Sequence, residues 1–160
     1  MILKKQFGLP LRLVQAIVVS LWLLFPVCGF AEPPADANAL LERWITAFNA
    51  HDLEAVAQLY TSDAVFFGVL SSKLSAGRES IRDNLNGAPE TGASVSIIVR
   101  SLVTLSDTAV MAVGFYQFDL QEGETRVPRL ARFTFVIAKH GDEWLIAHHH
   151  SSLVPLAPPQ

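Results

Sequence analysis

Cysteine is almost absent from this chain of 160 residues, since Cys28 is the only one. A lone thiol excludes an intrachain disulfide, so the fold must be held by its core or by partner subunits. Internal repeats, low-complexity tracts, P-loops and protein-kinase motifs are also missing, so no motif supports phosphoryl transfer. The length leaves room for one domain with an ordinary core.

The N-terminal segment has the composition of a secretory signal peptide. Three basic residues precede an apolar run at 13–27, and small residues stand three and one positions before Glu32. We therefore predict a signal peptide over 1–31 and a periplasmic or secreted protein, with no membrane contact after cleavage. Two alternatives stay open: the apolar run is retained as a membrane anchor, although Pro26 interrupts it, or Cys28 carries a lipid.

Cleavage would change the charge of the protein. It would remove three of the 12 Lys and Arg residues and none of the 15 Asp and Glu residues, which leaves a formal charge of about −6. Nucleic acid is therefore not expected as a partner. Residues 32–35 are predicted to be a linker, residues 36–155 the domain, and residues 156–160 a tail.

The first half of the domain is predicted to be mainly helical. Apolar residues recur at helical spacing over 40–48, and Asp36 or Asn38 is the expected N-cap of that helix. Asp52 is expected to cap a second helix. The predicted order is a helix to residue 48, a helix at 53–60, a strand at 64–69 and a helix at 77–85.

The second half is predicted to be strand. Short turns containing Ser-Asp, Gln-Glu-Gly-Glu and His-Gly-Asp separate four extended runs, so consecutive strands should pair as an antiparallel meander. Helices followed by a meander indicate an α+β fold. Both faces of this sheet carry apolar residues, so we expect helices on one face and a second copy of the chain on the other. The predicted strands are 94–105, 108–120, 125–139 and 143–152.

Three consecutive histidines lie near the end of the last predicted strand. Strict alternation places His148 and His150 on one face with Trp144 and Ile146, and His149 on the opposite face. His148 and His150 then either contact a ligand or substrate, or are buried imidazoles with hydrogen bonds to backbone and hydroxyl groups. No metal site is predicted, because no third ligand at zinc-like spacing accompanies them. No cofactor is expected.

Arg132 and Thr134 share one face of the preceding strand. A guanidinium in the middle of a sheet is costly unless it is paired. Arg132 is therefore expected either to bind a carboxylate-bearing ligand or to form an ion pair with Glu42, Glu54 or a neighbouring subunit.

Together these segments resemble the nuclear transport factor 2-like (SnoaL-like) superfamily. The likeness is closest to the association (hub) domain of calcium/calmodulin-dependent protein kinase II and its bacterial SgcJ/EcaC-type relatives. It implies a cone-shaped α+β fold, in which N-terminal helices pack on a curved, mainly antiparallel sheet that encloses a pocket, and assembly through the outer face of the sheet. The residues that carry it are Trp44, Phe48, 52–65, 77–81, Arg132-Phe-Thr134 and, most specifically, Gly-Asp-Glu-Trp-Leu-Ile-Ala-His-His-His-Ser at 141–151.

Two functional features of that superfamily are missing here. The catalytic aspartate of the ketosteroid isomerase branch would fall at or near Gly68, and the arginine that follows the last histidine in the kinase hub corresponds to Ser151. Neither an aspartate base nor an arginine cluster is therefore predicted for this chain.

Three functions remain. We expect a homodimeric or larger homo-oligomeric domain that binds a small apolar or carboxylate-bearing molecule in the cone pocket. The alternatives are a SnoaL- or SgcJ-type isomerase, dehydratase or oxidoreductase-like enzyme, with a histidine as acid or base, and a pure association domain. The candidate residues are Arg132, Thr134, Trp44 and Tyr60 for ligand binding, and His148, His150 and Tyr116 for catalysis.

Overall fold

The computed structural model describes residues 34–155, which all belong to one compact unit. The predicted signal peptide at 1–31, residues 32 and 33 of the predicted linker and the predicted tail at 156–160 lie outside the described residues. No helix within the described part is long and apolar enough to cross a membrane.

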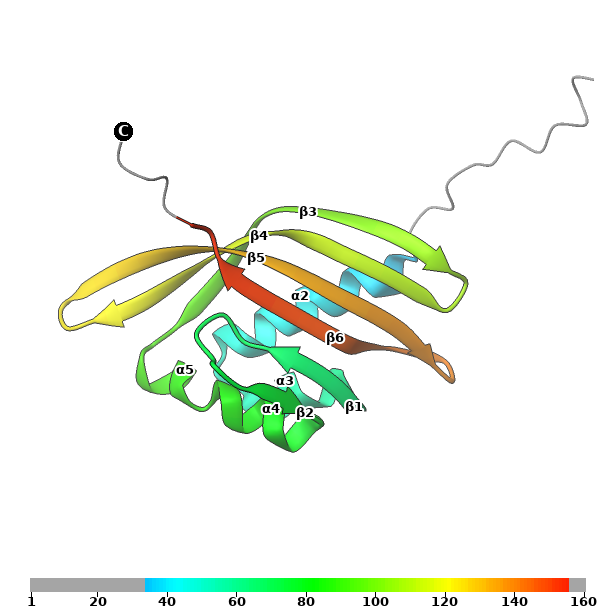
Figure 1. The fold of residues 1–160 in the computed structure, drawn as a ribbon, viewed down its shortest axis with the longest axis horizontal. Helices are drawn as coiled ribbons and strands as arrows, with labels where there is room; N and C mark the ends of the chain where they lie inside the picture. Colours follow the sequence, from blue (N-terminus) through cyan, green and yellow to red (C-terminus); the bar gives the residue numbers. More distant parts are fainter. Residues whose placement is uncertain (1–33, 156–160) are drawn as a thin grey trace, which may run out of the picture. The chain divides into compact units, whose positions relative to one another are not determined.

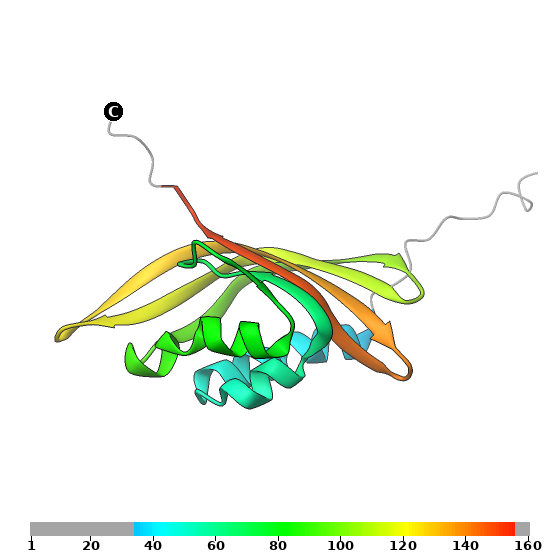
Figure 2. The same ribbon diagram turned by 60° about the horizontal axis from the view of Figure 1, so that its bottom comes forward.

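A curved sheet with helices on its concave face makes up the domain (Figures 1 and 2). The strand order is β2-β1-β6-β5-β4-β3, and every pair is antiparallel except β1 with β6. The predicted α+β class is thus confirmed. The elements are α2 (Ala35–Asn49), α3 (Leu53–Gln58), β1 (Tyr60–Phe67), β2 (Leu74–Ala76), α4 (Arg78–Leu85), α5 (Gly87–Glu90), β3 (Ser94–Ser106), β4 (Ala109–Glu122), β5 (Thr125–His140) and β6 (Glu143–Leu153).

Helices α2 and α3 differ in the residues that begin them. The predicted side-chain cap of α2 is wrong: Pro34 precedes the helix, and neither Asp36 nor Asn38 caps it. Asp36 lies in the first turn, where a carboxylate interacts favourably with the helix dipole. Helix α3 is capped as predicted, since the backbone N–H of Ala55 donates to Asp52 Oδ1 over 2.9 Å.

The core lies between the concave face and the helices. One stripe of α2 is buried, and its residues recur at the spacing that places side chains on a single face of a helix. Trp44 of this stripe stacks on Phe48 with ring centroids 5.3 Å apart and meets the edge of Phe135 on β5 at 5.5 Å. Burial of each such side chain stabilises the fold by about 1.5–3 kcal/mol.

Predicted and observed strands agree closely for β3 to β6, whose bounds differ by no more than two residues. Turn chemistry and long β-branched or aromatic runs mark these strands clearly. The three-residue β2 and the four-residue α5 were not predicted. Elements of this length show no periodicity in the sequence. Strand β2 forms through its tertiary pairing with β1.

A β-bulge at Ala147 interrupts the pairing of β5 with β6. Ile146 pairs with Ile137, and His148 pairs with the adjacent Val136, so Ala147 is the extra residue. One inserted residue reverses the alternation of a strand. Each side chain after Ala147 therefore lies on the face opposite to the one that strict alternation predicts for it.

The bulge relocates the three histidines. Trp144 and Ile146 are buried before it, and His149 is buried after it with 1% of its surface exposed. His148 and His150 consequently point to the convex face, away from the helices. The prediction that they share a face with Trp144 and Ile146 is wrong, because strict alternation ignores the inserted residue.

A second bulge, in β3, makes Gly114 of β4 sterically necessary. Ile97 pairs with Tyr116 and Val99 with Phe115, so the backbone of β3 bends toward β4 at this place. A Cβ atom on Gly114 would collide with the carbonyl oxygen of Val99 and lie 2.8 Å from Cζ of Phe133.

We expect Gly114→Ala to lower the free energy of unfolding by about 2 kcal/mol, because backbone must shift to admit the methyl group. Urea denaturation followed by circular dichroism measures this. Gly87→Ala is the matched control, since a Cβ there meets nothing within 4 Å; its effect should stay within about 0.5 kcal/mol. Equal stability of the two variants would contradict the steric argument.

Candidate functional site

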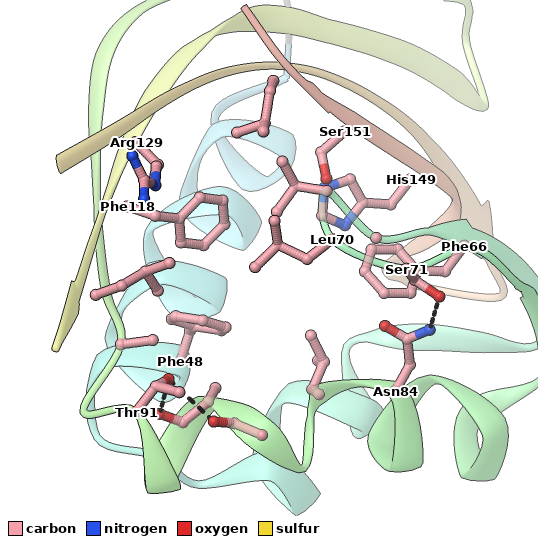
Figure 3. A pocket seen from close by; sticks show the side chains of 18 of the residues that line it. Phe48, Phe66, Leu70, Ser71, Asn84, Thr91, Phe118, Arg129, His149 and Ser151 are labelled. Atoms are coloured by element: carbon pink, nitrogen blue, oxygen red, sulfur yellow. Dashed lines mark hydrogen bonds between the residues drawn. The ribbon is translucent and has the colours of Figure 1, made fainter. Parts of the chain in front are cut away.

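A pocket of about 550 Å³ lies between the concave face of the sheet and the helices (Figure 3). This size suits a small molecule. None of the described residues that line it is Asp or Glu. Its wall is mainly apolar, and the large apolar members are Trp44, Phe48, Phe66, Val69, Leu70, Leu85, Phe118, Leu120 and Leu153.

His149 brings a buried imidazole to the pocket wall (Figure 3). Its ring stacks on Phe135 with centroids 3.8 Å apart, and the ring of Phe66 lies 4.8 Å away. Burial lowers the pKa of His149 well below 6.5, and the adjacent His148 and His150 lower it further. The imidazole is therefore neutral at pH 7.

A buried hydrogen-bond chain leads to this imidazole. The hydroxyl of Tyr60 lies 2.8 Å from Nδ1 of His149, and Nε1 of Trp44 donates to the same hydroxyl over 3.0 Å. Tyr60 is completely buried, and burial raises the pKa of its phenol. The chain thus consists of three neutral groups contributed by α2, β1 and β6.

Two buried polar atoms on the pocket-lining residues have no hydrogen-bond partner within residues 34–155. They are the hydroxyl of Tyr116 and Nε2 of His149. Tyr116 is 1% exposed; burial raises the pKa of its hydroxyl, and the nearby side chain of Ser151 lowers it in part. Because a buried polar atom without a partner costs about 1–3 kcal/mol, such atoms are rare unless a ligand or water satisfies them.

The segment 68–73 forms one rim of the pocket and is tied to α4. Asn84 Nδ2 donates to Ser71 Oγ over 2.8 Å (Figure 3). It also donates to Ser75 Oγ over 3.1 Å. Gly68, where the superfamily resemblance places a catalytic aspartate, lines the pocket without a functional group. Lys73 and Arg129 also line the pocket, and both are exposed.

The structure divides the predicted site residues between the two faces of the sheet. Trp44 and Tyr116 line the concave pocket, and Tyr60 is buried directly behind His149. The other four lie on the convex face, where Arg132, Thr134 and His150 border a shallow groove of about 640 Å³. The sheet separates His148 and His150 from Tyr116, so the structure does not bring the predicted catalytic residues together.

Arg132 forms no ion pair with Glu42 or Glu54 in the described part of the chain, and its expected contact with a ligand or a neighbouring subunit stays a prediction. Its Nε–H donates to Ser152 Oγ over 3.1 Å. Glu42 instead forms an ion pair with Arg100 at 2.6 Å, and Glu54 forms one with Arg82 at 3.5 Å.

His149 and Ser151 are two of the polar pocket residues that sequence reasoning missed. Both follow the bulge at Ala147, for which the sequence offers no turn or glycine signal. The run of three histidines was the available clue, since any register places at least one of them on the concave face. The described residues contain no group of three or more His, Cys, Asp or Glu placed to hold a metal ion.

The buried histidine predicts an acid-sensitive fold. Because the folded-state pKa of His149 lies below its unfolded value of 6.5, the unfolded state binds more protons below that pH. The free energy of unfolding should therefore fall as the pH drops below 6.5, by up to about 1.4 kcal/mol per pH unit for one proton.

Urea denaturation between pH 4 and 8 measures this slope, and we expect His149→Gln to remove most of it. His140→Gln serves as the control, since His140 is exposed and lies outside the buried hydrogen-bond chain; this variant should keep most of the slope. A slope that survives in His149→Gln would assign the acid sensitivity to other groups.

Comparison with known proteins gives the chain a family. The SnoaL-like domain family matches residues 37–157. Among solved structures, an assigned calcium/calmodulin-dependent protein kinase II association domain from Xanthomonas campestris is 29% identical, with a TM-score of 0.71 over 84% of this chain and 100% of that one. An NTF-2 like protein of unknown function from Shewanella oneidensis is 25% identical, with a TM-score of 0.61 over 76% of this chain and 99% of that one.

A third structure supports the fold alone. A ketosteroid isomerase-like protein from Erwinia carotovora atroseptica is 20% identical, with a TM-score of 0.68 over 79% of this chain and 100% of that one. Among curated proteins, none matches the chain significantly. The family match covers more than half of the chain, and the curved sheet over helices agrees with it, so this protein belongs to the SnoaL-like domain family.

Proposed function

We propose that this domain binds a small, largely apolar molecule in its concave pocket. The observation that carries the proposal is the pair of buried atoms without a partner, Tyr116 Oη and His149 Nε2, on an otherwise apolar wall. An apolar cavity with a few convergent polar groups is the usual composition of a small-molecule site. A ligand with one polar end would satisfy these atoms and fill the apolar remainder.

Binding fits this pocket better than acid–base catalysis. A general base works best when its pKa lies near the working pH, and burial holds the pKa of His149 well below 6.5. No carboxylate is found among the described residues of the wall. If the domain is an enzyme, its pocket offers neutral hydrogen-bond donors from His149 and Tyr116, and the chemistry would consist of polarising a bound group.

A carboxylate-bearing ligand would be oriented with its charged end outward. Lys73 and Arg129, the cations of the pocket lining, are exposed and therefore belong to its mouth. The composition of residues 1–31 supports action in the periplasm or outside the cell, where the domain would meet such molecules from its surroundings.

We expect the protein isolated from cells to carry a small-molecule adduct in native mass spectrometry. Ala88→Trp should remove the adduct, because Ala88 lines the pocket and an indole there would occupy its volume. Ala39→Trp introduces the same side chain at an exposed position of α2 outside the pocket and should retain the adduct. An adduct that persists in a folded Ala88→Trp variant would place the ligand elsewhere.

We further propose that the domain self-associates through the convex face of its sheet. Large apolar side chains are exposed there, among them Val99 at 54%, Phe115 at 41% and Leu130 at 43%. Several large apolar side chains exposed on one face favour an interaction site, and homo-oligomers reuse one patch on both copies. The similar Xanthomonas campestris protein is named as an association domain, which supports the same use of the fold here.

Phe115→Glu should convert the assembly to a monomer, because each copy would have to bury an unpaired carboxylate in the interface. Sedimentation velocity measures the mass. Ala39→Glu is the charge-matched control on an exposed helix position and should leave the assembly intact. A wild-type protein that sediments as a monomer at micromolar concentration would contradict self-association.

A further inference from the structure

The hydrogen-bond chain behind the pocket determines which kind of ligand atom the pocket accepts. We propose that Trp44 and Tyr60 hold His149 in its Nε2–H tautomer, so that the pocket presents a hydrogen-bond donor to the carbonyl oxygen of an uncharged ligand. This inference rests on the proposed binding function and names the class of molecule that is bound.

The direction of the chain follows from the chemistry of its members. The indole nitrogen of Trp44 can only donate, so the oxygen of Tyr60 accepts that bond. The hydroxyl of Tyr60 has one hydrogen, and Nδ1 of His149 lies 2.8 Å away. Nδ1 is therefore the acceptor. A neutral imidazole has a single N–H, which must then be on Nε2.

The opposite tautomer leaves more groups unsatisfied. If Nδ1 carried the hydrogen and donated to Tyr60, the hydroxyl hydrogen of Tyr60 would have no acceptor among the described residues. Tyr60 is fully buried and does not line the pocket, so a ligand could not supply that acceptor. In the Nε2–H tautomer, the one free hydrogen belongs to His149, which does line the pocket.

The free hydrogen on Nε2 determines that the ligand atom facing it must accept a hydrogen bond. A donor is satisfied only by an acceptor, and an ammonium group, which has no lone pair, would place hydrogen against hydrogen. The hydroxyl of Tyr116 is a second buried polar group in the same pocket, and the side chain of Ser151 lies near it. A carbonyl oxygen has two lone pairs and can accept from either group or from both.

The depth of these donors favours an uncharged carbonyl over a carboxylate. His149 and Tyr116 are 1% exposed, and each is neutral. A carboxylate at that depth would lose its hydration without gaining a cation, because Lys73 and Arg129 are exposed at the mouth. A ketone, ester or amide would lose much less hydration free energy at the same depth.

Trp44 and Tyr60 are positioning residues in this arrangement, and the first test concerns the tautomer itself. The protein expressed from its whole coding sequence is labelled with ¹⁵N in its five histidines. Two-bond ¹H–¹⁵N correlation spectra at pH 7 then identify which ring nitrogen of each is protonated. We expect His149, assigned by loss of its signals in His149→Gln, to show a protonated Nε2 and an unprotonated Nδ1.

Two variants separate the effect of the hydrogen-bond chain from general damage to the core. Tyr60→Phe removes the donor to Nδ1, so the two tautomers of His149 should become comparably populated. Trp44→Phe keeps that donor but removes the bond that directs it, so the Nε2–H form should remain the major one and lose part of its excess. A protonated Nδ1 in the wild-type protein, or an unchanged tautomer in a folded Tyr60→Phe variant, would overturn the proposal.

The second test uses three probes of similar shape: acetophenone, ethylbenzene and benzoate. Shifts of the His149 Nε2–H signal measure their binding. We expect acetophenone to bind about five- to tenfold more tightly than ethylbenzene, which lacks the acceptor, and more tightly than benzoate. In Tyr60→Phe the preference over ethylbenzene should fall by about half or more.

The two tests distinguish a failure of the inference from a failure of the proposed function. Equal binding of acetophenone and ethylbenzene would refute the acceptor preference and leave pocket binding intact. Tighter binding of benzoate would refute the uncharged class. If no probe shifts any pocket signal, both the acceptor preference and pocket binding are refuted, whereas the tautomer measurement still decides the role of Tyr60.

Discussion

The hydrogen bond between Tyr60 and His149 joins two strands of the domain that are far apart in the sequence. Its partners are 89 residues apart, at the start of β1 and near the end of β6, and Trp44 connects them to the long helix α2. A buried imidazole in an apolar setting is tolerated only with a partner, so this contact requires the parallel β1–β6 pair and the packing of α2 to form together. The wall of the pocket is a consequence of that requirement.

The bulge at Ala147 makes the contact geometrically available. Without the extra residue, the side chain of His149 would point to the convex face, and His148 would take its place under the sheet. Such a His148 would lie one position earlier along β6. A local change of one residue thus selects which imidazole meets Tyr60, and it leaves the remaining histidines on the surface where Arg132 and Thr134 border the convex groove. Bulges commonly re-aim side chains beside functional sites, and this one has the same effect.

Sequence patterns predicted the fold well and the site poorly, for different physical reasons. Helical spacing in α2 and the turns between β3 and β6 are local signals that can be read from the sequence. Burial of one face of the sheet then specifies the register of the strands strongly. Trp44 and Tyr116 line the pocket and Tyr60 is buried behind His149, but these three were singled out through the resemblance to the superfamily, and their roles stay predictions. His149 was missed because its direction depends on a bulge that arises from pairing with β5 and β1, and neither pairing is visible in the residues around Ala147. Tertiary register, rather than residue type, decides such positions.

The single sheet separates two surfaces with opposite chemistry, and this separation has a functional consequence. The concave side offers neutral, buried donors and no described carboxylate, whereas the convex side carries an exposed arginine, Arg132, beside exposed apolar side chains such as Phe115. Neighbouring residues on one strand, such as Phe115 and Tyr116, serve different faces. Ligand binding in the pocket and association through the convex face would therefore depend on different side chains while they share the same backbone.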